Sequence, residues 1–373
     1  MKGKTNAVVG SRGDVTSVEK INISLTSNQS SAADLLGATI TLEYGEYTKV
    51  VTWEGRYITM VIPSYVDYII KFGDVEGYAT PSMLELNAAP DNIRQIEALY
   101  QTEVITVAVS ADNGAPVSGQ NITINGVTMT LDNSGVVSHR IPYGTSYTVS
   151  VNGKYDYNLP VVQNFIASQP LRSISMIYEK LKLGVFIQDS TGRLWTESEW
   201  DSVGYTNDQS NGVAVVSDST RFVIAKVDTK DSRLAWGGYN KIITGVVSTT
   251  TMSEAVLDFD GAGNTAKILE QCAGYVAQDI TGAPASESCA AYVFTNGKNG
   301  YMGSLGQWQV AYNNMLSVNR IMTKIGGSAI QSGYYWASTQ GSEVYAWCIN
   351  WSSNVSTIAT KNATHYVRAF TDL

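Results

Sequence analysis

The chain has 373 residues, of which 44% are hydrophobic, so it is long enough for two or three domains. Its formal net charge of −8 makes nucleic acid or an anionic membrane surface a poor partner. No run approaches eighteen apolar residues, which excludes a membrane-spanning helix. Two histidines leave little from which to build a His-based metal site or catalytic triad.

Residues 1–17 are polar, and we expect a flexible lead-in or attachment segment there. They contain no apolar stretch of seven or more residues, so no signal peptide is visible in this chain. Three cysteines cannot form a disulfide framework. The sequence does not show whether Cys272 pairs with Cys289. It therefore does not show whether the protein works in an oxidising or a reducing compartment.

From residue 18 onwards the sequence has the pattern of β-strands. Runs of five to eight β-branched and aromatic residues are separated by Gly, Asn, Asp and Pro. The pattern also repeats, because Ile-Pro at 62–63 recurs at 141–142 and an apolar residue followed by Arg at 93–94 recurs at 171–172. The offset between the copies is 78 or 79 residues. Such a repeat indicates two tandem units of the same fold.

The repeat predicts two all-β sandwiches, at residues 18–103 and 104–180. The second copy contains GAPVSGQNITING and DNSGVVSHRIPYGTSYTV. In these segments it resembles the small immunoglobulin-like or prealbumin-like modules that serve as spacers in surface and virion proteins. Neither copy contains a catalytic motif, so we expect the modules to supply reach and stiffness.

Residues 181–373 have a different pattern, which predicts short strands around Trp195 and Trp200 and then three helices. The first covers 265–271, with Asn264 as its N-cap. The second begins after Ser304. The apolar stripe of the third helix, from about 317 to 325, consists of Val318, Ile321, Met322 and Ile325.

Asp258, Asp260 and Asn264 match the beginning of a calcium loop. The position at which an EF-hand needs a bidentate Glu is Leu269, however. We therefore interpret this segment as a turn that caps a helix, and we predict no metal and no cofactor. Whether a structural ion binds near Asp258 stays open.

A series of aromatic motifs fills the end of the chain: GYM at 300–302, YYWAST at 334–339, AW at 346–347 and YVRAF at 366–370. With these motifs residues 181–373 resemble the C-type lectin fold, in the branch that it shares with formylglycine-generating enzymes. More narrowly, the series resembles the variable proteins of diversity-generating retroelements in gut bacteria and their phages. The resemblance implies a multidomain chain in which an α+β C-type lectin-fold domain follows the two immunoglobulin-like sandwiches.

In that family, error-prone reverse transcription rewrites a C-terminal segment, largely at the adenines of codons such as AAC. Such a codon can come to encode Tyr, Ser, Gly, Cys or His, among others, but never Trp, Gln, Glu, Lys or Met. The resemblance implies a variable, ligand-binding segment at about 333–366. Its predicted ligand-binding residues are Tyr334, Gly341, Ser342, Val344, Tyr345, Cys348, Asn350, Ser352, Ser353, Asn354, Asn362, Thr364 and His365.

Several residues of the segment that AAC cannot encode are predicted to be scaffold, namely Trp336, Trp347, Trp351, Glu343 and Lys361, with Arg368 beyond it. Along a strand from 346 to 352, alternate side chains point to opposite faces. The set expected in the core is Trp347, Ile349 and Trp351. The set expected on an exposed binding face is Ala346, Cys348, Asn350 and Ser352. Antibody loops favour similar small and tyrosyl residues, although an ordinary edge strand with one solvated side has the same pattern.

The resulting hypothesis is a non-enzymatic ligand-binding or display protein with a diversified lectin-fold face. It would serve phage receptor binding or cell-surface attachment, on a phage tail or a bacterial cell surface. Its expected partner is a protein or glycan on a target cell, with no nucleic acid and no membrane insertion. Lectin-fold display proteins often trimerise, but the sequence shows no trimer motif. The alternatives are a fimbrial or adhesin-type surface protein and a calcium-independent glycan-binding lectin without diversification.

Two other functions lack their motifs. An oxidase of the formylglycine-generating type needs two reactive cysteines, and only Cys348 lies in the right half of the domain. A calcium-dependent lectin needs a Glu-Pro-Asn or Gln-Pro-Asp loop and a Trp-Asn-Asp strand, neither of which occurs. Stacking of a glycan on Tyr334, Tyr345 or Trp347 remains open.

Overall fold

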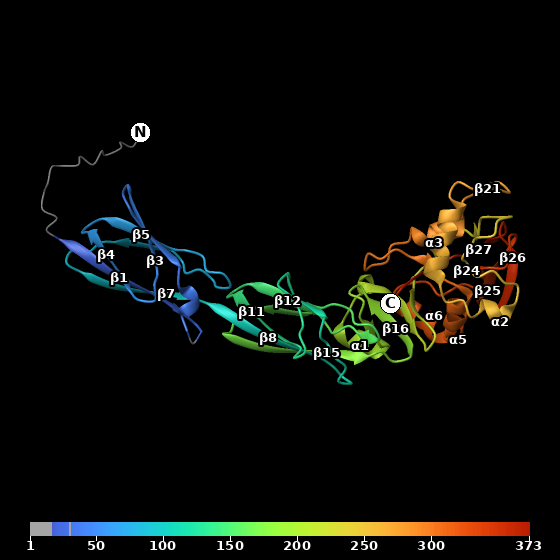
Figure 1. Cartoon of the computed structure of the whole chain (residues 1–373), viewed down its shortest axis with the longest axis horizontal. Helices are drawn as coiled ribbons and strands as arrows, with labels where there is room; N and C mark the ends of the chain where they lie inside the picture. Colours follow the sequence, from blue (N-terminus) through green and yellow to red (C-terminus); the bar gives the residue numbers. More distant parts are fainter. Residues whose placement is uncertain (1–16, 30) are drawn as a thin grey trace. The chain divides into compact units, whose positions relative to one another are not determined.

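The computed structural model describes residues 17–29 and 31–373 (Figure 1). The expected lead-in lies outside these residues, apart from its last position. The chain forms two compact units. The first contains most of both sandwiches, whereas the second comprises 153–159 and 179–373. In the part of the chain that is described, no helix is long and apolar enough to span a membrane.

The first sandwich consists of seven strands and a short 3-10 helix. These elements are β1 (Val18–Ser27), η1 (Ala33–Leu35), β2 (Thr39–Tyr44), β3 (Tyr47–Thr52), β4 (Ile58–Pro63), β5 (Asp67–Phe72), β6 (Leu84–Asn87) and β7 (Ile93–Tyr100). One sheet has the order β4-β1-β7 and the other β3-β2-β5-β6. Buried side chains of both sheets, such as Ile21, Ile62 and Ile70, share one core.

The second sandwich repeats this topology strand for strand. Its strands are β8 (Thr102–Ala111), β9 (Asn121–Ile124), β10 (Val127–Thr130), β11 (Val136–Pro142), β12 (Ser146–Val151), β13 (Tyr157–Asn158), β14 (Gln163–Ile166) and β15 (Leu171–Lys180). The sheets have the orders β11-β8-β15-β13 and β10-β9-β12-β14, so only the short β13 is additional. The predicted internal repeat is confirmed.

Each sandwich contains a fully buried glutamate that no sequence motif marks. In β1, Glu19 accepts a hydrogen bond from Arg94 Nε at 2.8 Å. In β8, Glu103 accepts from Arg172 Nε at 2.5 Å and from the Tyr147 hydroxyl at 2.6 Å. Burial opposes ionisation of Glu103, but the Arg172 guanidinium, the Tyr147 hydroxyl and two backbone N–H groups together hold its pKa at about 2. The arginines are those of the sequence repeat, so both copies preserve the same ion pair.

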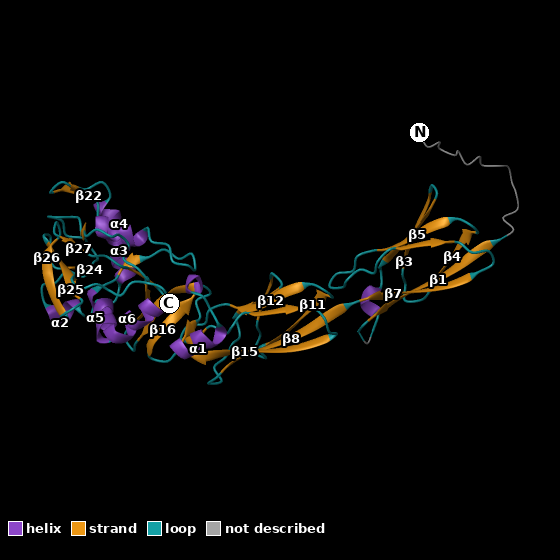
Figure 2. Cartoon of the chain, turned by 180° about the vertical axis from the view of Figure 1, so that it is seen from behind, coloured by secondary structure: helices purple, strands orange, loops and turns teal. Residues whose placement is uncertain are grey.

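Helices occur mainly in the C-terminal unit (Figure 2). Its helices are α1 (Glu197–Val203), η2 (Asn207–Gln209), α2 (Met252–Ala255), α3 (Gly261–Cys272), α4 (Pro284–Ala290), α5 (Leu305–Asn313) and α6 (Met315–Lys324). Its strands are β16 (Gly184–Asp189), β17 (Leu194–Trp195), β18 (Ser210–Val216), β19 (Arg221–Ile224), β20 (Leu234–Ala235), β21 (Val276–Ala277), β22 (Ile280–Thr281), β23 (Tyr301–Met302), β24 (Tyr334–Gln340), β25 (Tyr345–Asn350), β26 (Val355–Thr360), β27 (Thr364–His365) and β28 (Ala369–Thr371).

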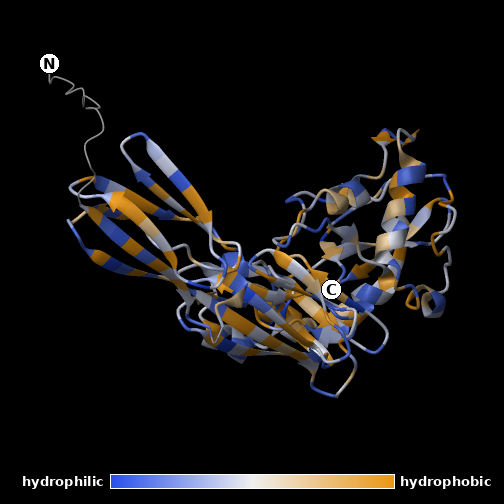
Figure 3. Ribbon diagram, turned by 60° about the vertical axis from the view of Figure 1, so that its left-hand side comes forward, coloured by the Kyte–Doolittle hydropathy of each residue, from blue (hydrophilic) through white to orange (hydrophobic). Residues whose placement is uncertain are grey.

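The C-terminal unit has apolar cores on both faces of its sheets. The main sheet has the order β17-β16-β18-β19-β28-β23, and a second sheet has the order β24-β25-β26. In β18, Val213 and Val215 contribute to one core, with residues of α5 and α6. Ala214 and Val216 contribute to the other core, with residues of α3 and α4. The strands of the sandwiches instead alternate between hydrophobic and hydrophilic residues (Figure 3).

Two of the predicted helices are confirmed. In α5 the side chains of Ser304 and Gln307 form a capping box, and in α6 the predicted apolar stripe is buried. The predicted cap of α3 is wrong, because Asp260 caps it and Asn264 lies buried inside the helix. Trp200, expected near short strands, lies in α1, whose capping box Thr196-x-x-Glu199 was visible in the sequence.

Replacing Glu103 by glutamine should destabilise the second sandwich. Removing one partner of a buried ion pair costs about 3–5 kcal/mol, so we expect a loss of about 3 kcal/mol in the free energy of unfolding at pH 7. Because the pKa of Glu103 is about 2 when folded and ordinarily 4.5, its contribution is complete above pH 4.5 and is lost as the pH falls through 2. In calorimetry of the full chain, the difference between wild type and variant should shrink across that window.

The matched control is Glu97→Gln, which removes an exposed carboxylate from β7. It should change stability by less than about 0.5 kcal/mol. A Glu103→Gln effect that is the same at pH 7 and pH 2 would show that the charge of Glu103 does not stabilise the fold.

Candidate functional site

The segment predicted to be variable forms the antiparallel sheet β24-β25-β26, with β25 in the middle. Turns at 341–344 and 351–354 join the three strands. Because successive antiparallel strands are joined at alternate ends, the two turns lie at opposite ends of the sheet. At about 3.4 Å per residue, the ends of β25 are about 17 Å apart. The predicted ligand-binding residues therefore cannot form one small pocket.

The three tryptophans predicted to be scaffold are buried, with exposed fractions of 0% for Trp336, 4% for Trp347 and 2% for Trp351. Trp336 Nε1 donates to the Leu234 carbonyl at 2.8 Å, and Trp347 Nε1 donates to the Thr249 carbonyl at 2.7 Å. Two indoles of the sheet therefore hold strand β20 and the loop that contains Thr249 against it.

The prediction that one face of β25 is exposed is wrong. Trp347 and Ile349 pack into one core, but Ala346 and Cys348 pack into the other. The physical reason is that β25 is a central strand with apolar side chains on both of its faces. Burial raises the pKa of Cys348 to about 12, and its thiol donates to the Thr357 carbonyl at 3.4 Å. Cys348 is thus inaccessible to a ligand.

Gly341 is the second correction, because it is buried as well. A Cβ at this position would lie 3.2 Å from Ile358 Cγ2 and 3.2 Å from Tyr345 Cβ. The position therefore serves the packing of the turn rather than contact with a ligand.

The other predicted ligand-binding residues are exposed or half-buried, and they form two groups. The first turn surface consists of Ser342, Val344, Tyr345 and Asn362. The second turn surface consists of Tyr334, Asn350, Ser352, Ser353, Asn354 and His365. Thr364, in β27, pairs with Ala235 beside the second group. A hydrogen bond from Lys361 N to the Val344 carbonyl, 2.9 Å long, brings Asn362 to the first turn.

Asn350 organises the second turn. Its Oδ1 accepts hydrogen bonds from the Ser352 backbone N at 3.0 Å and from Ser352 Oγ at 2.7 Å. Asn354 has a φ of +55°, a conformation that asparagine adopts more readily than most residues, and its Oδ1 accepts from Gln309 Nε2 at 3.0 Å. Ser352, Ser353 and Asn354 are all exposed at the tip of a fixed turn.

His365 is the titratable group of the second turn surface. The centroid of its ring lies 4.4 Å from that of Trp336 and 5.4 Å from that of Tyr334. Burial and then the charge of Arg233 lower its pKa to about 4, so the imidazole is neutral at pH 7. Its Nε2 is buried and has no hydrogen-bond partner among the described residues. This nitrogen is buried, so a ligand on the second turn surface does not reach it.

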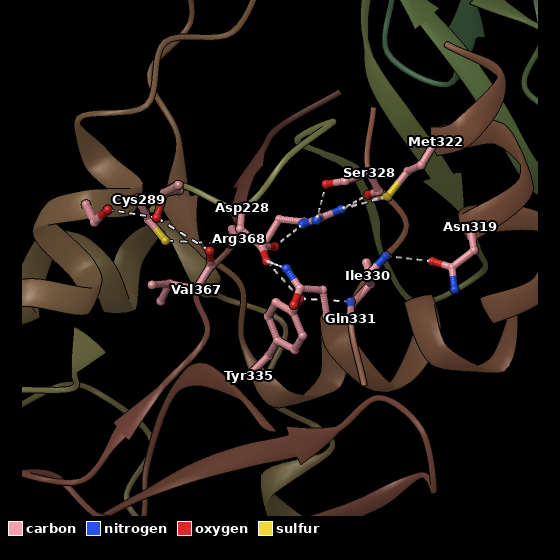
Figure 4. Close-up of polar contacts among 12 residues, drawn as sticks. Asp228, Cys289, Asn319, Met322, Ser328, Ile330, Gln331, Tyr335, Val367 and Arg368 are labelled. Carbon is pink, nitrogen blue, oxygen red and sulfur yellow. Dashed lines mark hydrogen bonds and ion pairs between the residues drawn. The ribbon is translucent and has the colours of Figure 1, made fainter. Parts of the chain in front are cut away.

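Arg368, predicted as scaffold, is 1% exposed and pairs with Asp228 (Figure 4). Its Nε lies 2.6 Å from Asp228 Oδ1, and its Nη1 donates to the Ser328 carbonyl at 2.9 Å. The other carboxylate oxygen of Asp228 accepts from the Tyr335 hydroxyl at 3.0 Å. One ion pair therefore joins the loop after β19, the loop after α6 and strand β24.

No sequence motif marks Asp228 or Arg233. A signal for Asp228 existed, because an arginine inside the apolar YVRAF strand needs a buried anionic partner. Arg233 lies with its Cζ 4.7 Å from the centroid of the Tyr366 ring. The pairing of β20 with β27, in which Leu234 lies opposite His365, brings Arg233 close to Tyr366 and His365.

The suspected calcium loop is a hydrogen-bonded cap. The Asp258 carboxylate accepts from Asn264 Nδ2 at 2.8 Å, from Thr339 Oγ1 at 2.6 Å and from the Asp260 backbone N at 3.1 Å. The described residues contain no group of three or more His, Cys, Asp or Glu side chains placed to hold a metal ion. Cys272 and Cys289, whose pairing the sequence left open, are both free and buried.

Arg368→Met should leave the Asp228 carboxylate buried without its cation. We expect the free energy of unfolding of the C-terminal unit to fall by about 4 kcal/mol. The control is Arg320→Met. The Arg320–Glu197 pair has a similar distance of 2.7 Å, but its arginine side chain is 63% exposed. The control substitution should lower the free energy of unfolding by less than about 1 kcal/mol. Tryptophan fluorescence during denaturation measures both, since Trp53 alone lies outside this unit. Equal losses for the two variants would contradict the assignment.

No family model matches the chain, and no curated protein matches it. Among solved structures, a fimbrial protein from Bacteroides ovatus is similar over 95% of this chain and 99% of its own, with 10% identity and a TM-score of 0.40. The shaft pilin SpaA from Lactobacillus rhamnosus GG matches 45% of this chain and 99% of its own, with 12% identity and a TM-score of 0.27. The TIE protein of Bacillus anthracis matches 48% of this chain and only 41% of its own, with 16% identity and a TM-score of 0.23. At such scores these likenesses do not identify what this chain binds, and the C-type lectin resemblance stays a prediction.

Proposed function

We propose that this chain is a surface-displayed, adhesin-type binding protein. The two sandwiches carry the C-terminal domain, and the two turn surfaces of sheet β24-β25-β26 contact a protein or glycan on a target cell. The observation that carries the proposal is the contrast between a central strand buried on both faces and turns whose side chains are exposed. Turn residues can therefore contact a ligand while the strands stay fixed.

The side chains of the turns suit recognition. Tyr345 is 37% exposed on the first turn surface, and Tyr334 is half-buried on the second. Tyrosine supplies a large, rigid contact area at a low cost in conformational entropy, whereas serine and asparagine supply adaptable hydrogen bonds. Together these groups suit sugar hydroxyls or a polar protein surface.

We further propose that the segment at about 333–366 is the diversified region of a C-type lectin-fold variable protein. Support comes from Lys361 and Trp347, which cannot derive from AAC and are 0% and 4% exposed. Glu343 cannot derive from AAC either, but it is exposed and departs from the pattern.

Eleven of the thirteen predicted ligand-binding positions are exposed or half-buried. AAC can also encode the buried Ala346 and Ile349. Gly341 and Cys348 depart from this division, because they are reachable from AAC but buried.

Tyr345→Ala and Ser353→Arg should each weaken binding at least tenfold without changing stability by more than about 1 kcal/mol, because both positions are exposed. The measurement is binding of the labelled full chain to whole gut-bacterial cells, by flow cytometry, and to an array of capsule polysaccharides. The control is Tyr57→Ala, which removes a tyrosine that is 69% exposed in the first sandwich. Wild-type binding by both turn variants would contradict the proposal.

The diversification has a separate test in the nucleotide sequence around the gene. We expect a template repeat nearly identical to the 3′ end of the gene, differing from it at adenines, with a reverse transcriptase gene nearby. If neither is present, the adhesin-type function stands without diversification. Mass spectrometry of purified virions and of outer-membrane fractions then separates a phage tail from a cell surface.

A further inference from the structure

The segment 153–159 of the second sandwich belongs to the C-terminal unit and is fixed to it. Asn158 and Leu194 exchange two hydrogen bonds of 2.8 Å, through the side-chain amide of one and the backbone of the other. The Arg193 guanidinium donates to the Leu159 carbonyl. The Leu181 backbone N donates to the Asp156 carbonyl at 2.9 Å. The segment therefore forms a rigid wall.

A cavity of about 660 Å³ lies between this wall, the loop after β16 and the loop before β23. Binding sites for small ligands commonly have volumes of about 300–1,000 Å³. The cavity is far in sequence from the two turn surfaces, and none of their residues lines it. The lining side chains that bear charge or an aromatic ring include Lys154, Tyr155, Asp156, Tyr157, Arg221 and Lys298.

The charges in the cavity are not equally engaged. Arg221 Nη2 lies 2.6 Å from Asp156 Oδ1, and Arg221, followed by Lys180, lowers the pKa of Asp156. The positive charge of Arg221 and the negative charge of Asp156 therefore cancel. Lys154 and Lys298 form no ion pair with any described residue, although the chain as a whole carries a net charge of −8. Asp372 also lines the cavity: its carboxylate accepts from the Tyr301 hydroxyl at 3.1 Å, and its backbone carbonyl accepts from Lys298 Nζ at 3.4 Å. The lining thus has two amino groups that lack a carboxylate partner, on a predominantly negative protein.

Tyr155 provides the apolar surface of the site. Its ring lies 4.1 Å from Arg221 Cζ, measured to the ring centroid, so the guanidinium supports the ring. The side chain is nevertheless 80% exposed. An exposed, supported aromatic ring beside amino groups matches a ligand with both a flat apolar face and an anionic group.

We propose that this cavity binds an acidic saccharide, with a sugar ring stacked on Tyr155 and its carboxylate bound by the amino groups of Lys154 and Lys298. A saccharide fits because a sugar ring has a C–H face for stacking and hydroxyls for the polar lining. The site lies outside the turn surfaces, so it goes beyond the proposed function and does not rest on it. The chain would then hold two independent recognition sites.

The test is isothermal titration calorimetry of the full chain with tetragalacturonate and, in parallel, with the neutral maltotetraose. Tetragalacturonate should bind and maltotetraose should bind at least tenfold more weakly. Lys154→Ser/Lys298→Ser should weaken tetragalacturonate binding at least tenfold, and Tyr155→Ala at least fivefold, whereas Tyr155→Phe should retain it. A charge-matched control, Lys20→Ser/Lys49→Ser, removes two exposed lysines of the first sandwich and should leave binding unchanged.

Several results would overturn the inference: no binding of tetragalacturonate to the wild type, equal binding of both saccharides, or unchanged binding by the Lys154→Ser/Lys298→Ser variant. The turn variants Tyr345→Ala and Ser353→Arg separate it from the proposed function. If they bind tetragalacturonate as the wild type does, the cavity site stands alone. If they lose this binding while the lysine variant keeps it, the saccharide binds at the turns and the cavity inference fails.

Discussion

A buried arginine must have an anionic partner, and much of the C-terminal unit is arranged around that requirement at Arg368. The ion pair with Asp228 lies in a region almost free of water, where an unpaired charge would cost several kcal/mol. Arg368 also donates a hydrogen bond to the Ser328 carbonyl, and Asp228 accepts one from the Tyr335 hydroxyl. The loop that contains Asp228 also leads into β20, which pairs with β27 and so sets the position of His365.

Much of the fold could be predicted from short-range patterns. The strands of the sandwiches, the start of α5 after Ser304 and the stripe of α6 all rest on residues close together in sequence, and the repeat rests on comparing two such local patterns. Glu19 and Glu103 were missed because a lone glutamate in a strand looks exposed until its arginine, some seventy residues later, is placed beside it. The capping box Thr196-x-x-Glu199 indicates the helix that contains Trp200, but the aromatic residues of this segment are equally typical of strands, so the strand prediction at Trp200 is wrong.

The candidate site could be predicted only in part. Strand alternation correctly placed Trp347 and Ile349 together, but it could not reveal that a second core covers the opposite face, where Ala346 and Cys348 lie. Small residues are as typical of a tightly packed face as of an exposed one. The division into two turn surfaces likewise depends on the register of three strands. The cavity beside Tyr155 combines residues 153–159 with residues far along the chain in the same compact unit, and no local sequence pattern could indicate that juxtaposition.

The pairing of the first and last strands in each sandwich has a mechanical consequence. Because β1 runs parallel to β7, and β8 parallel to β15, the chain enters and leaves each ladder at opposite ends. A force that pulls apart the two ends of a module would load all the hydrogen bonds of the ladder at once, in shear, instead of opening them one after another. The two modules are therefore built to resist pulling.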